Sequence, residues 1–302
     1  MNKTFKTLLA SVLSIGLLSG VAHAADKEKV YLITMDQMDQ HWAKVNEGAE
    51  KAAKEFENVE LKWMAPDIKD DAKQIEIINN AVAAGAKVLI VAANGPNAVT
   101  RALKEADGAG VKIIYVDSPA DFEGIATFAT NNAAAGKIAG EEMIKALKAK
   151  GIESGKIGII NVNAATQSVV QREEGFREAF KGSKFEILAT QYSEGDVARS
   201  KDIAANYITQ GVVGIYGTNE GTTTGAGNAI REDGNKIIGI GFDNSDSIRN
   251  LIKNGALLAA MVQNPDTMGY MGVKCASESL KGDYKGEKQV DTGVTVMTKD
   301  KL

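Results

Sequence analysis

The sequence has few of the residues on which covalent and metal chemistry depend. It contains one cysteine, Cys275, and two histidines, His23 and His41, in 302 residues. A single cysteine excludes an intramolecular disulfide and any site with several cysteine ligands. Catalysis of the Ser-His-Asp or Cys-His type, and most histidine metal sites, would have to use one of the two histidines. We read Cys275, which lies among Met271, Val273 and Ala276, as a small buried hydrophobic residue.

Prolines are also few, and the sequence has no excess of positive charge. There are 4 prolines but 31 glycines, which fits many short turns and argues against proline-rich linkers. With 35 basic and 39 acidic residues the net charge is −4, so the sequence lacks the concentrated basic surface that nucleic acid requires. Hydrophobic residues make up 44% and charged residues 25%, which excludes a disordered chain, a collagen and a polytopic membrane protein. The length suggests about two domains.

The first 24 residues have the three-part layout of a secretory signal peptide. Two lysines in MNKTFK precede an uncharged apolar run at 8–20, and Ala22-His23-Ala24 forms a small-x-small cleavage site. We therefore predict a signal peptide at 1–24, cleaved after Ala24, and a periplasmic protein. A buried N-terminal helix is the alternative. Residue 25 is alanine, so no lipoprotein anchor is expected, and cleavage leaves His41 as the one histidine.

Apolar runs alternate with segments of helical periodicity along the rest of the chain. Strands are predicted at 29–35, 59–64, 87–93, 111–117, 124–130, 156–162, 185–190, 212–217, 236–243 and 257–263, with helices between most of them. Continuously apolar strands separated by helices are typical of parallel sheets covered on both faces. That many strands exceed one open sheet, and the pattern restarts at Lys156. The predicted fold class is α/β with two lobes. A single eight-fold barrel is the alternative.

Polar and aromatic side chains stand where the predicted strands end, the edge at which open α/β sheets bind ligands. They are Asp36, Asp39, His41, Trp42, Asp117, Asn219, Glu220, Asp243 and Gln263, together with Arg172 on a helix. Carboxylates and amides bridge neighbouring hydroxyls, arginine supplies a fork of donors, and an aromatic ring covers C–H groups. The set suits a polyhydroxylated ligand. Taken singly, each residue has another interpretation. The aspartates could cap helices, Trp42 could belong to the core, and His41 could be structural. Arg172 could be a solvated helix residue or part of an ion pair.

The order of these features resembles the periplasmic sugar-binding proteins of the ribose/galactose-binding type, which are receptors of ABC importers and have the type I periplasmic binding fold. The matching stretches cover nearly the whole chain after the signal peptide. The most specific are GKIAGE at 136–141, GFDN at 241–244 and QNPD at 263–266.

The resemblance implies two Rossmann-like lobes with parallel sheets, joined by a three-segment hinge, with the ligand in the cleft between them. The expected first lobe is 25–131 plus 265–289, and the expected second lobe is 132–264 plus 290–302. The implied ligand-binding residues are Asp39, His41, Trp42, Asn94, Asp117, Arg172, Asn219, Asp243 and Gln263. Asn94 enters this set because Ala92 stands at the family's polar strand-end position, and Arg172 occupies the arginine of an R-x-x-G-F pattern.

Three departures argue against ribose itself. Ser118 stands where ribose binders have arginine, and His41 and Gly195 stand where aromatic rings flank the sugar. The expected ligand is therefore another sugar or polyol: a pentose, hexose, cyclitol or alditol.

The sequence thus predicts a monomeric periplasmic receptor that closes its lobes around a sugar or polyol and delivers it to the permease of an ABC importer. We expect no enzyme activity, no cofactor, no metal and no nucleic-acid partner. Two alternatives remain. One is an exported carbohydrate-active enzyme that uses Asp36 with Asp39, or Asp117 with Asp243, as its carboxylate pair. The other is a ligand-sensing receptor that acts on a membrane signalling partner.

Overall fold

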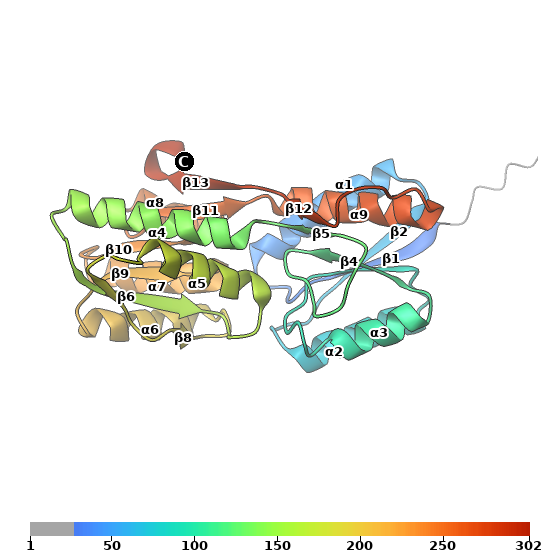
Figure 1. Ribbon diagram of the computed structural model, residues 1–302, viewed down its shortest axis with the longest axis horizontal. Helices are drawn as coiled ribbons and strands as arrows, with labels where there is room; N and C mark the ends of the chain where they lie inside the picture. Colours follow the sequence, from blue (N-terminus) through green and yellow to red (C-terminus); the bar gives the residue numbers. More distant parts are fainter. Residues whose placement is uncertain (1–26) are drawn as a thin grey trace, which may run out of the picture.

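The computed structural model describes residues 27–302, and the predicted signal peptide with its cleavage site lies outside the described residues. Two β-sheets, each covered by helices, lie at opposite ends of an elongated molecule (Figure 1). The two-sheet arrangement confirms the predicted α/β class and contradicts the single eight-fold barrel. None of the helices in 27–302 is long and apolar enough to cross a membrane.

The first sheet contains six parallel strands. They are β1 (Glu28–Ile33), β2 (Val59–Met64), β3 (Val88–Val91), β4 (Lys112–Val116), β5 (Thr127–Ala129) and β12 (Gln289–Asp291). Their order is β12-β5-β4-β3-β1-β2. The helices that pack with this sheet are α1 (Gln40–Glu55), α2 (Asp71–Ala83), α3 (Thr100–Gly108) and α9 (Pro265–Lys281). We call this unit the first lobe.

The second sheet has the same arrangement with one reversed edge. Its strands are β6 (Gly155–Asn161), β7 (Phe185–Ile187), β8 (Gln191–Tyr192), β9 (Val212–Gly217), β10 (Ile238–Phe242), β11 (Ala259–Gln263) and β13 (Val294–Thr298). The order is β13-β11-β10-β9-β6-β7, with β8 beside β6, and β13 is antiparallel to β11. The helices of this second lobe are α4 (Asn132–Ala149), α5 (Gln167–Ala179), α6 (Val197–Thr209), α7 (Glu220–Glu232) and α8 (Asp246–Lys253), and a short 3-10 helix, Lys299–Lys301, follows β13.

Successive strand residues supply the cores on opposite faces of each sheet. In β1, Val30 and Leu32 pack with α1 and α9, whereas Tyr31 and Ile33 pack with α2 and α3. Side chains of a strand alternate between faces, so a strand with helices on both sides is apolar at every position. This is why the runs in the sequence are continuous rather than alternating.

The described chain passes between the two lobes three times. The passages run from β5 to α4, from β11 to α9, and from β12 to β13. The predicted strand at 185–190 is wrong in its second half, because β7 ends at Ile187 and Gln191–Tyr192 form the separate strand β8. The predicted strand at 124–130 is shorter in the structure, where β5 covers Thr127–Ala129.

Glycines at one helix crossing explain two of the sequence motifs. A Cβ atom built on Gly136 of α4 would lie 2.0 Å from the carbonyl oxygen of Arg172 on α5. One built on Gly175 of α5 would lie 1.9 Å from the carbonyl oxygen of Ala133. Any side chain at either position would push the two helices apart. The close crossing holds Arg172 beside Asn132, the first residue of α4.

Candidate ligand-binding site

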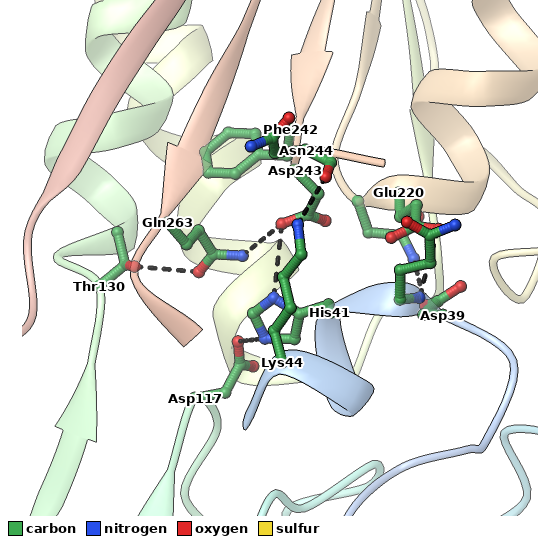
Figure 2. Close-up of polar contacts among 12 residues, drawn as sticks. Asp39, His41, Lys44, Asp117, Thr130, Glu220, Phe242, Asp243, Asn244 and Gln263 are labelled. Carbon is green, nitrogen blue, oxygen red and sulfur yellow. Dashed lines mark hydrogen bonds and ion pairs between the residues drawn. The ribbon is translucent and has the colours of Figure 1, made fainter. Parts of the chain in front are cut away.

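Asp117 and Asp243 occupy equivalent places in the two lobes. Asp117 follows β4 and Asp243 follows β10, and each of these strands is the third from the same edge of its sheet. Both residues are in the left-handed region, with φ of 60° and 76°. A non-glycine residue in this conformation is uncommon, although aspartate tolerates it better than most. The turn directs both carboxylates toward the space between the lobes (Figure 2).

His41, in the first turn of α1, lies between these two carboxylates (Figure 2). Its Nε2 is 3.1 Å from Asp117 Oδ2, and its Nδ1 is 3.7 Å from Asp243 Oδ1. Burial by itself would lower the pKa of His41, but the close Asp117 carboxylate and the negative charge of Asp243 outweigh it and raise this pKa. Burial would likewise raise the pKa of Asp117, and the neighbouring His41 and Arg172 lower it instead.

The imidazole keeps unused hydrogen-bonding capacity. Despite the short distance to Asp117, the buried Nε2 has no aligned hydrogen-bond partner within the described chain. A buried donor without an acceptor costs free energy, so such a group marks a place where a ligand atom would fit. Trp42 packs against this ring edge to face, with 4.7 Å between the ring centres.

Arg172 is the second buried cation of the site and is only 2% exposed. Its Nε donates to Asn132 Oδ1 (2.8 Å), its Nη1 to the Thr218 carbonyl (2.9 Å) and its Nη2 to Gln263 Oε1 (2.7 Å). The guanidinium lies 4.1 Å from the centre of the Phe242 ring. The alternative interpretation of Arg172 as a solvated helix residue is therefore wrong. The close α4–α5 crossing turns its side chain inward.

Gln263, the last residue of β11, connects the site to the segments that join the lobes. Its Nε2 donates to Asp243 Oδ1 at 2.7 Å, and its Oε1 accepts from Thr130 Oγ1 at 2.9 Å (Figure 2). The same Oε1 also accepts from Arg172. Thr130 follows β5, so two of the three passages between the lobes meet at this amide. We call His41, Asp117, Arg172, Asp243 and Gln263 the central cluster.

A second group of charges lines the same space and includes Lys69, a residue that the sequence analysis did not predict. Lys69, between β2 and α2, donates from Nζ to Asp36 Oδ2 and, at 2.7 Å, to Asp39 Oδ2. We call Asp36, Asp39 and Lys69 the carboxylate–lysine cluster. Lys69 stands in the polar stretch APDIKDD, whose composition is that of an exposed loop. No periodicity or motif distinguishes it from the other loop lysines.

Asp36 is largely structural. It accepts hydrogen bonds from the backbone N–H groups of Met38 (2.6 Å) and Asp39 (2.9 Å) and from Trp42 Nε1 (3.1 Å). Burial acts to raise the pKa of Asp36, but Lys69 and the two backbone N–H donors lower it. For Asp39 burial prevails and its pKa is raised, while the pKa of Lys69 is raised by the two carboxylates despite burial.

Polar contacts also join the two lobes beside this cluster. Asn219 Nδ2 lies 3.5 Å from Asp39 Oδ2, and the Asn219 side chain caps α7 by accepting from the N–H of Thr222. Glu220 Oε1 accepts from the N–H of Gln40 at 3.4 Å (Figure 2). Burial, with Asp243 and Asp39 nearby, raises the pKa of Glu220 to about 7. The lobes are thus in direct contact across the site.

Eight of the nine predicted site residues line one cavity of about 30 Å³ between the lobes. They are Asp39, His41, Trp42, Asp117, Arg172, Asn219, Asp243 and Gln263, and the other lining residues are Met35, Lys69, Val162, Thr166, Ser168 and Val169. A hollow of about 370 Å³ adjoins this cavity and shares His41, Asp243 and Gln263 with it. The lining residues provide hydrogen-bond acceptors, hydrogen-bond donors and apolar side chains. Among residues 27–302 there is no group of three or more histidine, cysteine or acidic side chains arranged to hold a metal ion.

Asn94 is the predicted site residue that the structure places elsewhere. Its side-chain amide donates to Asp71 Oδ1, and it lines a separate hollow of about 440 Å³. Asn94 stands three residues beyond the end of β3, and its backbone N–H is held by Gln74 Oε1. This turn carries its side chain toward α2, away from the cavity.

Comparison with known proteins identifies the family. The family model described as "Periplasmic binding protein domain" matches residues 30–283. The chain belongs to the periplasmic binding proteins. This periplasmic binding protein is 28% identical over 297 residues to the ribose import binding protein RbsB of Haemophilus influenzae, covering 97% of this chain and 98% of the relative. It is 26% identical over 299 residues to the D-allose-binding periplasmic protein of Escherichia coli, covering 93% of each.

Solved structures of this family have the same fold. A carbohydrate transporter solute-binding protein from Agrobacterium radiobacter, in complex with D-arabinose, has a TM-score of 0.86 and 31% identity over 91% of this chain and 95% of that one. An ABC transporter solute-binding protein from Agrobacterium vitis with bound D-fucose has a TM-score of 0.84 and 29% identity over 90% and 96%. The family consists of periplasmic solute-binding receptors, and this chain is one of them.

Proposed function

We propose that this receptor binds a small neutral sugar or polyol between its lobes and delivers it to the permease of an ABC importer. The observation that carries the proposal is the shared cavity. Eight side chains that the sequence places on separate strands, turns and helices line it together. The relatives named above are a ribose import binding protein and a D-allose-binding protein. The similar structures contain bound D-arabinose and D-fucose.

The lining assigns a role to each kind of side chain. Asp117 and Asp243 accept from ligand hydroxyls, while His41 Nε2 and the Arg172 guanidinium donate to ligand oxygens. Trp42, Met35, Val162 and Val169 cover the C–H groups of the ligand. Asn94 is left out of the proposed contacts because its amide is directed to Asp71.

Lobe movement gives the ligand access. The cavity has room for about one water molecule, so a sugar enters only after the lobes separate and the central side chains shift. The three passages between the lobes support a hinge, and hinge closure around a ligand is a common transition in receptors of this kind. The proposed moving units are the expected ones, 25–131 with 265–289 and 132–264 with 290–302, except that the last boundary shifts to 291, because β12 (Gln289–Asp291) belongs to the first sheet. The protein acts as a monomer exported by cleavage after Ala24.

Calorimetric titration tests the ligand class. The panel contains D-ribose, D-allose, D-arabinose, D-fucose, myo-inositol and xylitol, and we expect saturable one-to-one binding of at least one of them. A receptor that binds no sugar, cyclitol or alditol would contradict the proposal. Mass spectrometry of the small molecule that copurifies with the protein identifies the ligand directly. N-terminal sequencing of the periplasmic protein checks for Ala25 as the first residue, and light scattering checks for a monomer.

A further inference from the structure

Lys69 is a charged group of the cavity wall to which the proposed function gives no role. It lies in a loop, yet its side chain is only 8% exposed, and its ammonium lies in the cavity lining beside Asp39. Lysine is almost never buried unless it is paired, and here Asp36 and Asp39 compensate its charge. The next lysine of the chain, Lys73, is 44% exposed and pairs with the exposed Asp67, as loop lysines usually do.

The second lobe leaves space for this ammonium. Gly195 precedes α6 and has φ of 76°, a conformation that favours glycine. A Cβ atom built there would lie 3.4 Å from Lys69 Nζ and 3.3 Å from Asn219 Nδ2. A side chain extending beyond Cβ at residue 195 would therefore crowd both groups. Lys69 thus reaches the contact between the lobes at a point where the second lobe presents only backbone.

Hydrogen-bond capacity remains on both members of the Lys69–Asp39 pair. An ammonium has three N–H donors, and Asp36 and Asp39 accept two of them. Asp39 Oδ2 receives Lys69 and Asn219, so its Oδ1 has no hydrogen bond from any described residue. A free donor on Lys69 and a free acceptor on Asp39 therefore belong to two paired residues that line this end of the cavity. One hydroxyl satisfies both, since it accepts from Lys69 and donates to Asp39.

The local charge excludes other ligand groups. The cluster holds two carboxylates and one ammonium, so a ligand carboxylate or phosphate would meet a net negative charge. A ligand methyl group or hydrogen at this position would displace water without replacing its hydrogen bonds to the remaining donor and acceptor, whose side chains are only 8% and 15% exposed, which is costly. The pair accordingly favours a neutral, hydroxylated end.

We propose that Lys69 and Asp39 form a specificity-determining pair that reads one hydroxyl of a neutral polyol and rejects analogues with a hydrogen, methyl or carboxylate group there. The inference rests on the proposed function, because it assigns a role within the same ligand site. It adds a contact from a loop residue and narrows the ligand class to neutral molecules that carry a hydroxyl at this one position.

The test is a set of calorimetric titrations of wild type, Lys69→Met and the surface control Lys73→Met. The probes are the tightest binder among D-ribose, D-allose, D-arabinose and D-fucose, each of its monodeoxy analogues, and its aldonic acid. We expect wild type to bind one deoxy analogue and the acid at least roughly 10-fold more weakly than the parent. Lys69→Met should weaken the parent roughly 10- to 100-fold and abolish discrimination at that one position. Lys73→Met should match wild type at every probe.

Two results would overturn the inference. One is an equal loss of affinity for the parent and all deoxy analogues in Lys69→Met, which is the signature of a structural role. The other is a wild type that accepts every deoxy analogue and the acid as well as the parent. Should Lys69→Met not fold, as judged by circular dichroism, Lys69→Gln retains donors at this position and should keep part of the discrimination. Failure of wild type to bind any sugar would instead contradict the proposed function itself.

Discussion

The two buried charge clusters of the site differ in where their members come from. The central cluster draws His41 and Asp117 from the first lobe and Arg172, Asp243 and Gln263 from the second. The carboxylate–lysine cluster lies wholly in the first lobe, within one loop, the end of β1 and the start of α1. When the lobes separate, His41 loses Asp243, whereas Lys69 keeps both of its carboxylates. The first cluster is therefore linked to lobe closure, and the second to the order of the first lobe.

The largest expected effect comes from Arg172→Met, because Arg172 belongs to the central cluster and is also part of the second-lobe core. The change leaves Asn132 Oδ1 and the Thr218 carbonyl without a buried donor and removes one of the two donors to Gln263 Oε1. We expect the free energy of unfolding in urea to fall by about 3–5 kcal/mol and binding to be lost. Arg177→Met is the matched control on the same helix, since Arg177 is 37% exposed and pairs with Glu173. It should cost less than about 1 kcal/mol. If the free energy of unfolding fell equally in the two variants, the burial of Arg172 would not contribute to stability as proposed.

Asp117→Ala and Asp243→Ala should abolish ligand binding while leaving the fold intact. Each removes a carboxylate that faces His41 across the site, and unpaired ligand hydroxyls cost roughly 1–3 kcal/mol per contact. Two lost contacts therefore cost roughly 2–6 kcal/mol, which is at least roughly 30-fold in affinity. Calorimetry measures the binding, and circular dichroism verifies the fold. Wild-type affinity in both variants would break the assignment of the central cluster to the ligand.

Asp36→Ala should instead destabilise the fold while leaving the effect of the ligand in place. Its hydrogen bonds, to two backbone N–H groups, Trp42 and Lys69, all lie within the first lobe. We expect the unfolding free energy to fall by about 1–3 kcal/mol whether or not ligand is present. Thermal melts with and without ligand measure this, and the stabilisation conferred by the ligand should persist. Loss of that ligand effect would mean that the two clusters are not independent.

Glu220→Gln should stabilise the protein at alkaline pH. Burial raises the pKa of Glu220 from 4.5 to about 7, so the folded state binds a proton more tightly than the unfolded state and stability falls as the pH rises through this range. The glutamine removes that loss, with a gain on the order of 1 kcal/mol at pH 8 and none at pH 4. Melting curves across this range measure it. Glu232→Gln, at the exposed far end of α7, serves as the control and should leave the pH profile unchanged.

The smallest expected effect is the pH dependence that His41 contributes. Its pKa is raised above 6.5 in the folded state, so its contribution is complete below pH 6.5 and is lost as the pH rises through the folded value. Asp117 has a pKa lowered from 3.8, so its contribution is present above pH 3.8 and is lost on acidification. The central cluster should therefore stabilise the folded protein most between about pH 3.8 and pH 6.5. His41→Gln should flatten the alkaline side of a melting-temperature profile, and an unchanged slope there would contradict the pairing.

The ends of parallel strands made most of the site predictable. Asp117, Asp243 and Gln263 follow apolar runs whose boundaries are plain in the sequence, and such strand ends meet at one edge of a sheet. Asn94 does not follow this rule because two turn residues separate it from the end of β3, and such a turn can redirect a side chain. Lys69 was missed because its burial depends on a loop folding back onto Asp36 and Asp39.

Local patterns by themselves determined the α/β class, the two lobes and eight of the cavity residues, because hydrophobic periodicity and strand ends are properties of short segments. Only the tertiary structure decided the partners. The position of His41 between two carboxylates, the three acceptors of Arg172 and the burial of Lys69 all join residues far apart in the chain. Such contacts depend on how closely the lobes, helices and loops approach one another, which no short segment encodes.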